Sequence, residues 1–261
     1  MKPFLKWPGG KRHLLKELMP LIPEAFSNYY EPFAGGAALF FALKPSSAIL
    51  CDNNFDLINC YIQVRDNPQK VIDCLSKYKN SETEYYKIRD MSPEDDIVSA
   101  ARIIYLTTLS FNGIYRTNLK GKFNVPYGRK THINPCDSLK ILDASKILSV
   151  AEILCADFSD ITETATVGDI VYFDPPYTVS HSNNGFIKYN SKIFSWDDQL
   201  RLANISNMLV QRGCRVIISN AYHPSVLHLY KGFNTKIVQR FSIISASSDF
   251  RRVIQECIFY N

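Results

Sequence analysis

The sequence predicts an α/β fold with a mostly parallel sheet, helices on both faces and an antiparallel strand at its C-terminal edge. Two observations support this prediction. Short apolar runs that end in small or acidic residues alternate with helical patterns along much of the chain. The last two apolar runs, at 235–243 and 252–261, follow each other without a helix, which is typical of an antiparallel hairpin. A length of 261 residues suits one such domain with an insertion.

The expected strands and helices alternate, and most of their boundaries carry a local signal. The helix at 195–213 is the clearest, because Ser195 is a suitable N-cap, Asp198 follows three residues later and Gly213 stands at its end. In chain order we expect a strand and glycine turn at 28–36, a helix at 37–43, a strand at 47–52, a helix from 55, strands at 150–158 and 169–177, the helix at 195–213 and a strand at 214–222.

The segment 54–150 interrupts this alternation. We expect two or three helices between Phe55 and Leu109, and another near Asp137–Leu148. Between them, turn signals and short apolar runs predict two strands around a turn at Leu119–Lys122. We therefore expect a catalytic domain made of 1–53 and 151–261, and an insertion over 54–150 whose hairpin lies at about 111–134.

Composition excludes some classes of protein and favours one kind of partner. No run of about eighteen apolar residues occurs, the five histidines lack metal-ligand spacing, and the seven cysteines form no C-x-x-C pair. We expect a cytoplasmic protein with free thiols, no membrane segment and no metal. The net charge is only +5, but residues 1–16 and 110–134 contain ten lysines and arginines together and no acid. This pattern favours a polyanionic partner, although two solvated surfaces would also explain it.

Candidate ligand sites follow the strands, where open α/β sheets bind their ligands. The glycines of "EPFAGG", 31–36, let backbone approach a ligand closely, although a tight turn is the simpler explanation. Asp52 could accept the two hydroxyls of a ribose or cap the next helix. Asp157 and Phe158 could hold an adenine by its amine and its face, but Phe158 could equally belong to the core.

The stretch "DPPY", Asp174 to Tyr177, ends the strand at 169–177. Pro175 and Pro176 keep the backbone extended and supply no N–H groups. An acid, a fixed carbonyl and an aromatic ring therefore converge, which suits an aromatic amine that donates two hydrogen bonds and stacks on Tyr177. A proline-rich turn at the end of a strand would explain the prolines but not the residues on either side.

Four motifs together resemble the Dam-type DNA adenine methyltransferases: "FLKWPGGKR" at 4–12, "EPFAGG", "FNGIYRTNLKGKFNVPYG" at 111–128, and "DPPY". The resemblance covers nearly the whole chain in the family's order. It implies a Rossmann-like methyltransferase sheet, S-adenosylmethionine as cofactor, and methylation of an adenine flipped out of double-stranded DNA, with Asp174, Pro175, Pro176 and Tyr177 as catalytic residues. We expect a monomer. The residues that it implies for cofactor binding are Trp7, Lys11, Phe33, Gly35, Asp52, Asp157, Phe158 and Asp174.

The resemblance also implies how DNA is recognised, with GATC as the site. Lys6 and Arg116 match positions that contact guanine, and Ile114 and Pro126 match positions that meet a thymine methyl group. Phe111 and Asn112 match residues that probe or fill the gap left by the flipped base. Phosphates would be held by Asn118, Asn124 and Arg129. The residues Lys130-Thr131-His132 depart from the family's pattern. The loop at 178–194, which contains the polar stretch 180–194, is expected to be mobile and to close over the flipped base, or to be a disordered surface loop.

Other functions stay open on the sequence alone. Related enzymes that act on RNA or on a protein amide are one alternative, but those that modify glutamine usually carry Asn in place of Asp174. Two further alternatives are a catalytically inactive DNA-binding relative and an adenine methyltransferase with a different recognition site. The sequence lacks the glycine spacing that binding of a nicotinamide dinucleotide requires.

Overall fold

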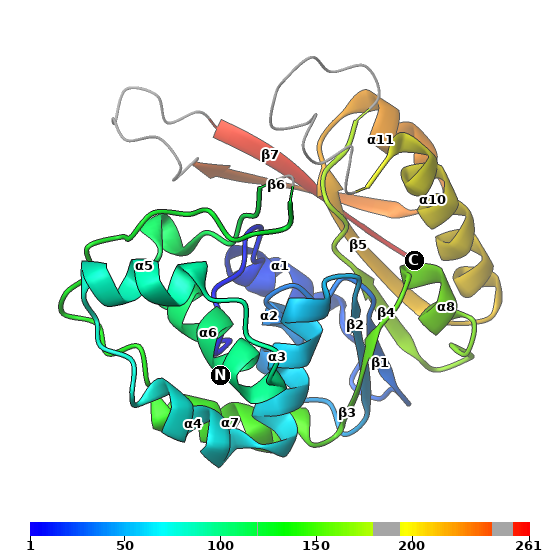
Figure 1. The fold of residues 1–261 in the computed structure, drawn as a ribbon. Helices are drawn as coiled ribbons and strands as arrows, with labels where there is room; N and C mark the ends of the chain where they lie inside the picture. The colour runs from blue at the N-terminus through cyan, green and yellow to red at the C-terminus, as the bar shows by residue number, and fades with distance from the viewer. Residues whose placement is uncertain (119, 180–193, 242–252) are drawn as a thin grey trace. The chain divides into compact units, whose positions relative to one another are not determined.

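The computed structural model describes residues 1–118, 120–179, 194–241 and 253–261, which form two compact units (Figure 1). Unit 1 is Met1–Leu15 with Ala34–Asp157, and unit 2 is Lys16–Phe33 with Phe158–Asn261. Both boundaries of the expected insertion, 53/54 and 150/151, fall inside unit 1, so the division into catalytic and recognition domains stays a prediction. Of the expected loop at 178–194, only residues 178, 179 and 194 are described.

In the described part of unit 2, five strands lie in the order β1-β4-β5-β7-β6 (Figure 1). β1, β4 and β5 are parallel, while β7 is antiparallel to both β5 and β6. All four residues of β4 are buried, as its uninterrupted apolar sequence predicts for a strand covered on both faces. The mostly parallel α/β fold with antiparallel C-terminal strands is confirmed. The bounds are β1 Tyr29–Glu31, β4 Ile170–Phe173, β5 Arg215–Ala221, β6 Asn234–Phe241 and β7 Val253–Tyr260.

The helices of unit 2 include the one whose ends the sequence marks most clearly. α10, Trp196–Gln211, begins with a capping box in which Ser195 and Asp198 exchange hydrogen bonds with each other's backbone N–H groups. α8, Phe158–Thr162, and α11, Pro224–Leu229, were not expected, because five or six residues are too few to display helical periodicity.

Before β1 lie three short turns of helix: η1 Arg12–Leu14, α1 Leu15–Leu18 and η2 Met19–Leu21.

Unit 1 joins a parallel strand pair to a group of helices. β2, Ala48–Asp52, pairs with β3, Ala151–Cys155, in a register that places Asp52 opposite Cys155. Four helices, rather than two or three, occupy the stretch from Phe55 to Leu109. Pro68 starts a new helix directly after the first, and side-chain N-caps start the other two. The helices are α2 Ala38–Leu43, α3 Phe55–Asp66, α4 Pro68–Leu75, α5 Glu82–Asp90, α6 Asp96–Leu109 and α7 Ser138–Leu148.

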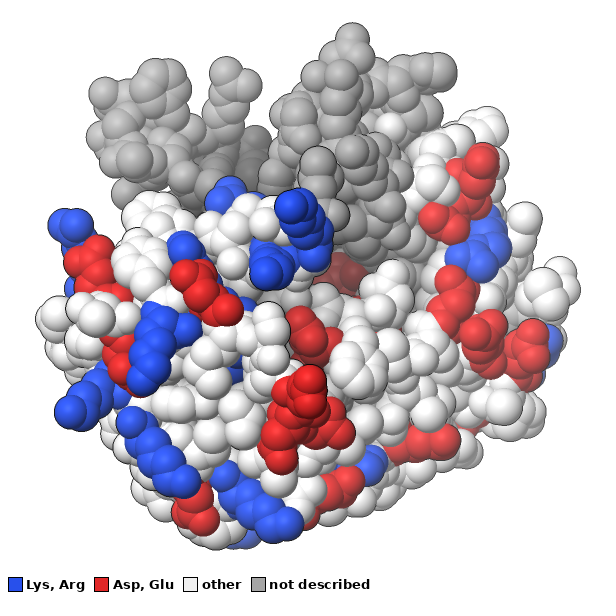
Figure 2. Space-filling view, viewed as in Figure 1, with Lys and Arg blue, Asp and Glu red and all other residues white. Residues whose placement is uncertain are grey.

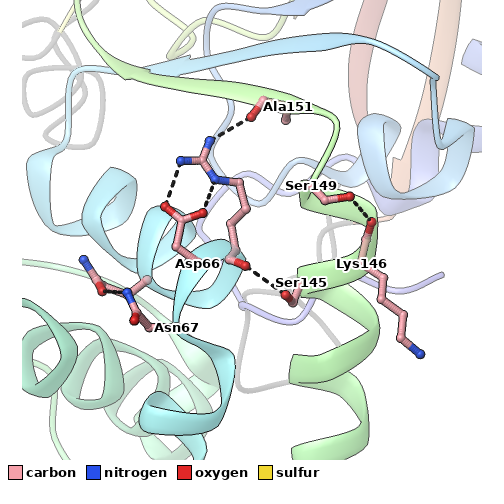
Figure 3. A network of polar contacts seen from close by, with 8 residues as sticks. Asp66, Asn67, Ser145, Lys146, Ser149 and Ala151 are labelled. Carbon is pink, nitrogen blue, oxygen red and sulfur yellow. Dashed lines mark hydrogen bonds and ion pairs between the residues drawn. The ribbon is translucent and has the colours of Figure 1, made fainter.

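Arg65, at the end of α3, connects three elements of unit 1. Figure 3 labels its partners Asp66, Ser145 and Ala151. Its guanidinium donates to the Ala151 carbonyl at the start of β3 and to both oxygens of Asp66. Its own carbonyl accepts from the Ser145 hydroxyl of α7. These contacts place the beginning and the end of the 54–150 segment side by side against β3.

None of the described helices has both the length and the hydropathy of a membrane span.

The expected hairpin of unit 1 is present as two isolated antiparallel bridges, Ser110↔Tyr127 and Thr117↔Phe123, rather than as continuous strands. Its inner bridge is closed by backbone hydrogen bonds from Asn118 to Lys122 and from Asn124 to Arg116. Leu119, at the expected turn, lies outside the described residues. We call residues 110–134 the recognition segment, after the role that the resemblance implies for the hairpin within it. The Tyr85 hydroxyl of α5 donates to the Val125 carbonyl, which attaches this segment to the helices.

Gly128 provides a test of how closely the recognition segment must approach α6. A Cβ at this position would lie 2.6 Å from the Ser110 carbonyl oxygen and 2.8 Å from that of Leu109. We expect Gly128→Ala to lower the free energy of unfolding by about 1–3 kcal/mol, measured by urea denaturation. Gly232→Ala is the control, since nothing lies within 4 Å of its added Cβ. Equal stability of the two variants would contradict the close approach.

Candidate active site

Asp174 follows β4 directly, and a hydrogen-bonded chain of side chains in unit 2 orients it. The Ser219 hydroxyl on β5 donates to Asp174 Oδ1 at 2.7 Å, and the Tyr172 hydroxyl lies 3.0 Å from the Ser219 oxygen. Tyr172 is buried, whereas Asp174 is partly exposed. Burial, reinforced by the charge of Asp174, raises the pKa of Tyr172 well above its usual value, so this hydroxyl stays protonated.

Tyr177 is held at its hydroxyl as well as through its backbone. The hydroxyl donates to Glu256 Oε2 on β7 at 3.0 Å, and Glu256 is 1% exposed. Pro175 is buried, and Tyr177 itself is partly exposed. The structure thus brings the acid, the two prolines and the ring of "DPPY" to the end of a fully buried strand, as expected.

Phe33 and Phe158 meet in a cluster of rings in unit 2. Their centroids lie 5.2 Å apart in a stacked arrangement, and Phe194 is edge-on to Phe33 at 5.4 Å. The guanidinium of Arg201 lies 4.4 Å from the centroid of Phe158, which is only 4% exposed. Phe158 is therefore part of the core, as one of the two alternatives expected, and its contact with an adenine stays a prediction.

Asp52 holds the glycine turn of unit 1. Its Oδ2 accepts from the Gly35 N–H at 3.1 Å and its Oδ1 from the Asn54 N–H at 3.0 Å. Burial raises the pKa of Asp52, and these backbone N–H groups oppose that effect. The helix N-cap is Asn54, which accepts from the Leu57 N–H, so capping is not the role of Asp52. The Asn53 N–H is a third backbone donor to this carboxylate, which offers about four acceptor positions in all.

The two basic segments that contain no acid lie against each other in unit 1. Trp7 stacks on Tyr115 with centroids 4.3 Å apart and an interplanar angle of 25°. Lys6 lies over Gly113 so closely that a Cβ there would be 2.8 Å from its Cδ. The Tyr115 hydroxyl donates to Asp56 at the start of α3, and burial followed by that carboxylate raises the pKa of Tyr115 to about 12. Residues separated by more than a hundred positions therefore form one surface.

The residues expected to contact DNA occupy the exposed part of this surface. Phe111 is 53% exposed, and Asn112 beside it has a φ of 54°, a left-handed conformation that is uncommon outside glycine and often marks a functional site. Arg116 is exposed, and its Nε donates to the Asn124 side chain at 2.8 Å. In Figure 2, Lys and Arg over unit 1 are interspersed with Asp and Glu, so the absence of acids is a property of the two sequence segments and not of the whole face.

Lys130 attaches the end of the recognition segment to α6. Its ammonium donates to the carbonyls of Thr108 at 3.0 Å and Ser110 at 2.8 Å, which caps the C-terminus of the helix. Partial burial, with a smaller contribution from Lys6, lowers the pKa of Lys130 to about 8. The sequence did not suggest this role. Lys130 is the first of the three residues, 130–132, that depart from the family's pattern, and its contacts with α6 give that residue a structural role.

Comparison with known proteins identifies the family. A model of the D12 class N6 adenine-specific DNA methyltransferases matches residues 7–244. The chain belongs to this family. The type II methyltransferase M1.LlaDCHI of Lactococcus lactis is 39% identical over 100% of this chain and 95% of its own length. The type II methyltransferase M.MjaIII of Methanocaldococcus jannaschii is 35% identical over 97% of this chain and 96% of its own length. A DNA adenine methylase of Vibrio cholerae is 30% identical over 98% of this chain and 94% of its own length.

The protein is therefore an adenine-specific DNA methyltransferase, and DNA is its substrate class. Within unit 1 the structure brings Asp52 into contact with Gly35. It also brings Lys6 and Trp7 into contact with the recognition segment. Lys11 is 7% exposed and Asp157 is half-buried. Within unit 2 it unites Phe33 with Phe158. Asn118, whose side chain accepts from the Lys120 and Lys122 N–H groups, closes the turn. Among the described residues, no cluster of three or more His, Cys, Asp or Glu could hold a metal ion.

Sequence reasoning missed four residues that hold parts of the candidate regions in place: Ser219 and Glu256 in unit 2, and Tyr115 and Lys130 in unit 1. Two of them carried a signal. Ser219 ends a buried apolar run, and Glu256 is an acid within an otherwise apolar strand, where an unpaired charge would be costly. Tyr115 and Lys130 act through partners that are distant in sequence, so nothing local distinguishes them.

The lowered pKa of Lys130 predicts how the stability of the methyltransferase changes with pH. The folded protein releases this proton near pH 8, whereas the unfolded chain keeps it until about pH 10.5, so proton release favours folding between these values. Relative to Lys130→Met, the wild type should gain roughly 0.5–1 kcal/mol between pH 7 and pH 9 in urea denaturation, allowing for solvent screening. Lys122→Met, at an exposed lysine, is the control. An unchanged difference between wild type and Lys130→Met would contradict the assignment.

Proposed function

We propose that this enzyme is a site-specific methyltransferase that modifies adenine in double-stranded DNA, with GATC as its target sequence. It transfers a methyl group to the exocyclic amine of an adenine that has left the base stack. The observation that carries the proposal is the carboxylate of Asp174, which ends a fully buried strand and is oriented by Ser219. A base inside a duplex cannot reach such a site, so base flipping is part of the proposal.

The chemistry requires an amine that is a poor nucleophile to be positioned and activated. Its lone pair is delocalised into the adenine ring. Hydrogen bonds from its two N–H groups to Asp174 and to the Pro175 carbonyl localise that pair and direct it towards the methyl donor. Tyr177 provides a new stacking partner for the flipped base. The Ser219 hydroxyl fixes one oxygen of Asp174, so little reorganisation is needed during the reaction.

S-adenosylmethionine, the general donor of methyltransferases, supplies a sulfonium-bound methyl group when it is bound. The described residues suit such a ligand. Asp52, held over the glycine turn, would accept the ribose hydroxyls, and the Phe33–Phe158 cluster would pack on the adenine. Glycine at 35, with a φ of 45°, permits the close approach of backbone. Trp7, Lys11 and Asp157 complete the proposed set.

Recognition of GATC is assigned to the surface formed by the two basic segments. Lys6 and Arg116 would contact guanine, and Ile114 and Pro126 would meet thymine methyl groups. Phe111 and Asn112 would occupy the gap that the flipped base leaves. The supporting observation is that Lys6 lies against the recognition segment although the two are distant in sequence. Asn118, Asn124 and Arg129 would contact phosphates, and Asn124 would also orient Arg116.

Removal of the Asp174 carboxylate tests the catalytic assignment. We expect Asp174→Ala to reduce methyl transfer by roughly a hundredfold or more, because the amine loses its acceptor, while affinity for duplex DNA is retained. Transfer of a radiolabelled methyl group and a gel-shift assay measure the two properties. Asp197→Ala, at an exposed acid on α10, is the matched control. Near-normal turnover of Asp174→Ala would refute the assignment.

Site specificity is tested with duplexes that differ from GATC at one base pair. The wild type should methylate GATC in preference to each substituted duplex. Arg116→Ala should lose about 1–3 kcal/mol of discrimination at the guanine that it reads, as the ratio of kcat/KM values reports. Lys122→Ala, an exposed residue of the same segment, should leave the ratio unchanged. Equal rates on all duplexes would exclude GATC.

One experiment also separates this proposal from its alternatives. The chain is expressed in a host that lacks DNA methylation, and methyladenine is then mapped by sequencing. Methylation at GATC supports the proposal. Methylation at another sequence indicates an adenine methyltransferase of different specificity, and an unmodified genome indicates an inactive relative.

A further inference from the structure

Glu256 is a buried acid in unit 2 to which the reaction described above gives no role. It lies on β7 opposite Ala221 of β5 and Val238 of β6, so the backbone that carries it is paired on both sides. A carboxylate that is 1% exposed loses most of its hydration, and this loss is costly unless a donor compensates it. Tyr177 provides such a donor through its hydroxyl, at 3.0 Å from Oε2.

The hydrogen bond from Tyr177 to Glu256 constrains a ring that the backbone alone does not fix. Pro175 and Pro176 stiffen the main chain, but the ring of a tyrosine can still rotate about two side-chain bonds. An acceptor at the far end of the ring, carried by a strand inside the sheet, limits the first rotation because it fixes the position of the hydroxyl. Since a phenolic O–H prefers the plane of its ring, the direction of the acceptor also favours one ring plane. Burial and the charges of Asp174 and Glu256 raise the pKa of Tyr177 well above its usual value. The hydroxyl therefore remains protonated and able to donate throughout the working pH range.

The burial of Glu256 makes this a strong constraint. Because the acid lies away from bulk water, the hydrogen bond is less exposed to competition from solvent. A purely structural requirement at this position of β7 would be met by an apolar residue, like those at Ile258 and Phe259.

We propose that Glu256 is a positioning residue for methyl transfer, which holds the ring of Tyr177 in the orientation that stacks on the target adenine. The inference rests on the proposed function, since it assigns a cause to the placement of the stacking ring. Glu256 acts through Tyr177 and does not itself contact the base.

A double-mutant cycle tests whether Glu256 acts through Tyr177. Glu256→Met removes the acceptor at similar volume, and Tyr177→Phe removes the donor and keeps the ring. Each should lower the single-turnover rate of methyl transfer to duplex DNA by roughly ten- to a hundredfold. The double variant should be no slower than the slower single variant, because both changes break one interaction. Glu256→Gln, whose amide oxygen still accepts, should recover most of the rate. Gln255→Met, at the neighbouring position of β7, is the control.

A binding measurement without cofactor gives a second readout that a merely structural role would not change. A duplex with 2-aminopurine at the target position fluoresces when the base leaves the stack and is quenched when it lies on an aromatic ring. With equal affinity for this duplex, Glu256→Met should give brighter bound fluorescence than the wild type, and Glu256→Gln should resemble the wild type. If Glu256→Met does not fold, Tyr177→Phe supplies the same comparison.

The outcomes separate this inference from the proposed function. Multiplicative losses in the cycle, or failure of Glu256→Gln to recover activity, would overturn the role of Glu256 while leaving the methyltransferase assignment intact. Absence of methyl transfer by the wild type would overturn the proposed function, and this inference with it.

Discussion

The organisation of unit 2 depends on a carboxylate at the end of a strand whose every residue is buried. Asp174 is partly exposed, but it borders the buried interior of the sheet, and the fold supplies a donor for it there. Ser219 on β5 does this for Asp174, and the same hydroxyl is in contact with Tyr172 on β4. Since the parallel pairing of β4 with β5 places these residues on adjacent strand ends, the orientation of Asp174 is a consequence of sheet register.

Unit 1 solves a different problem, which is to hold exposed side chains, proposed above to read bases, on a segment with little regular structure. Two isolated bridges would not hold such a segment alone. It is fixed instead by side-chain contacts with the surrounding elements. Tyr85 from α5 and Trp7 from the N-terminal segment contact it, and the ammonium of its own Lys130 donates to a carbonyl of α6. The exposed residues Phe111, Asn112 and Arg116 thus rest on a support made almost entirely of aromatic and polar contacts.

The order of strands and helices was largely predictable from sequence, because alternating apolar runs, the capping box at Ser195 and the proline pair report local preferences. The resemblance carried by four motifs located the family correctly. What could not be predicted depends on contacts between distant residues. The division of 55–109 into four helices was underestimated because Pro68 and the N-caps act within a continuous helical pattern. The stack of Trp7 on Tyr115 and the pairing of Tyr177 with Glu256 link positions separated by more than seventy residues, for which no local pattern exists.

The place of β7 has a consequence for synthesis of the protein on the ribosome. β7 follows β6 in the chain but lies between β6 and β5, so β6 cannot join the sheet until residues 253–260 have been translated. Until then β5 has an unpaired edge, which invites association with other chains. The nascent chain also lacks Glu256, the partner of Tyr177. A partly translated enzyme therefore contains the motif "DPPY" long before it contains the strand that orients its tyrosine, which delays a correctly assembled site until the last strand has emerged.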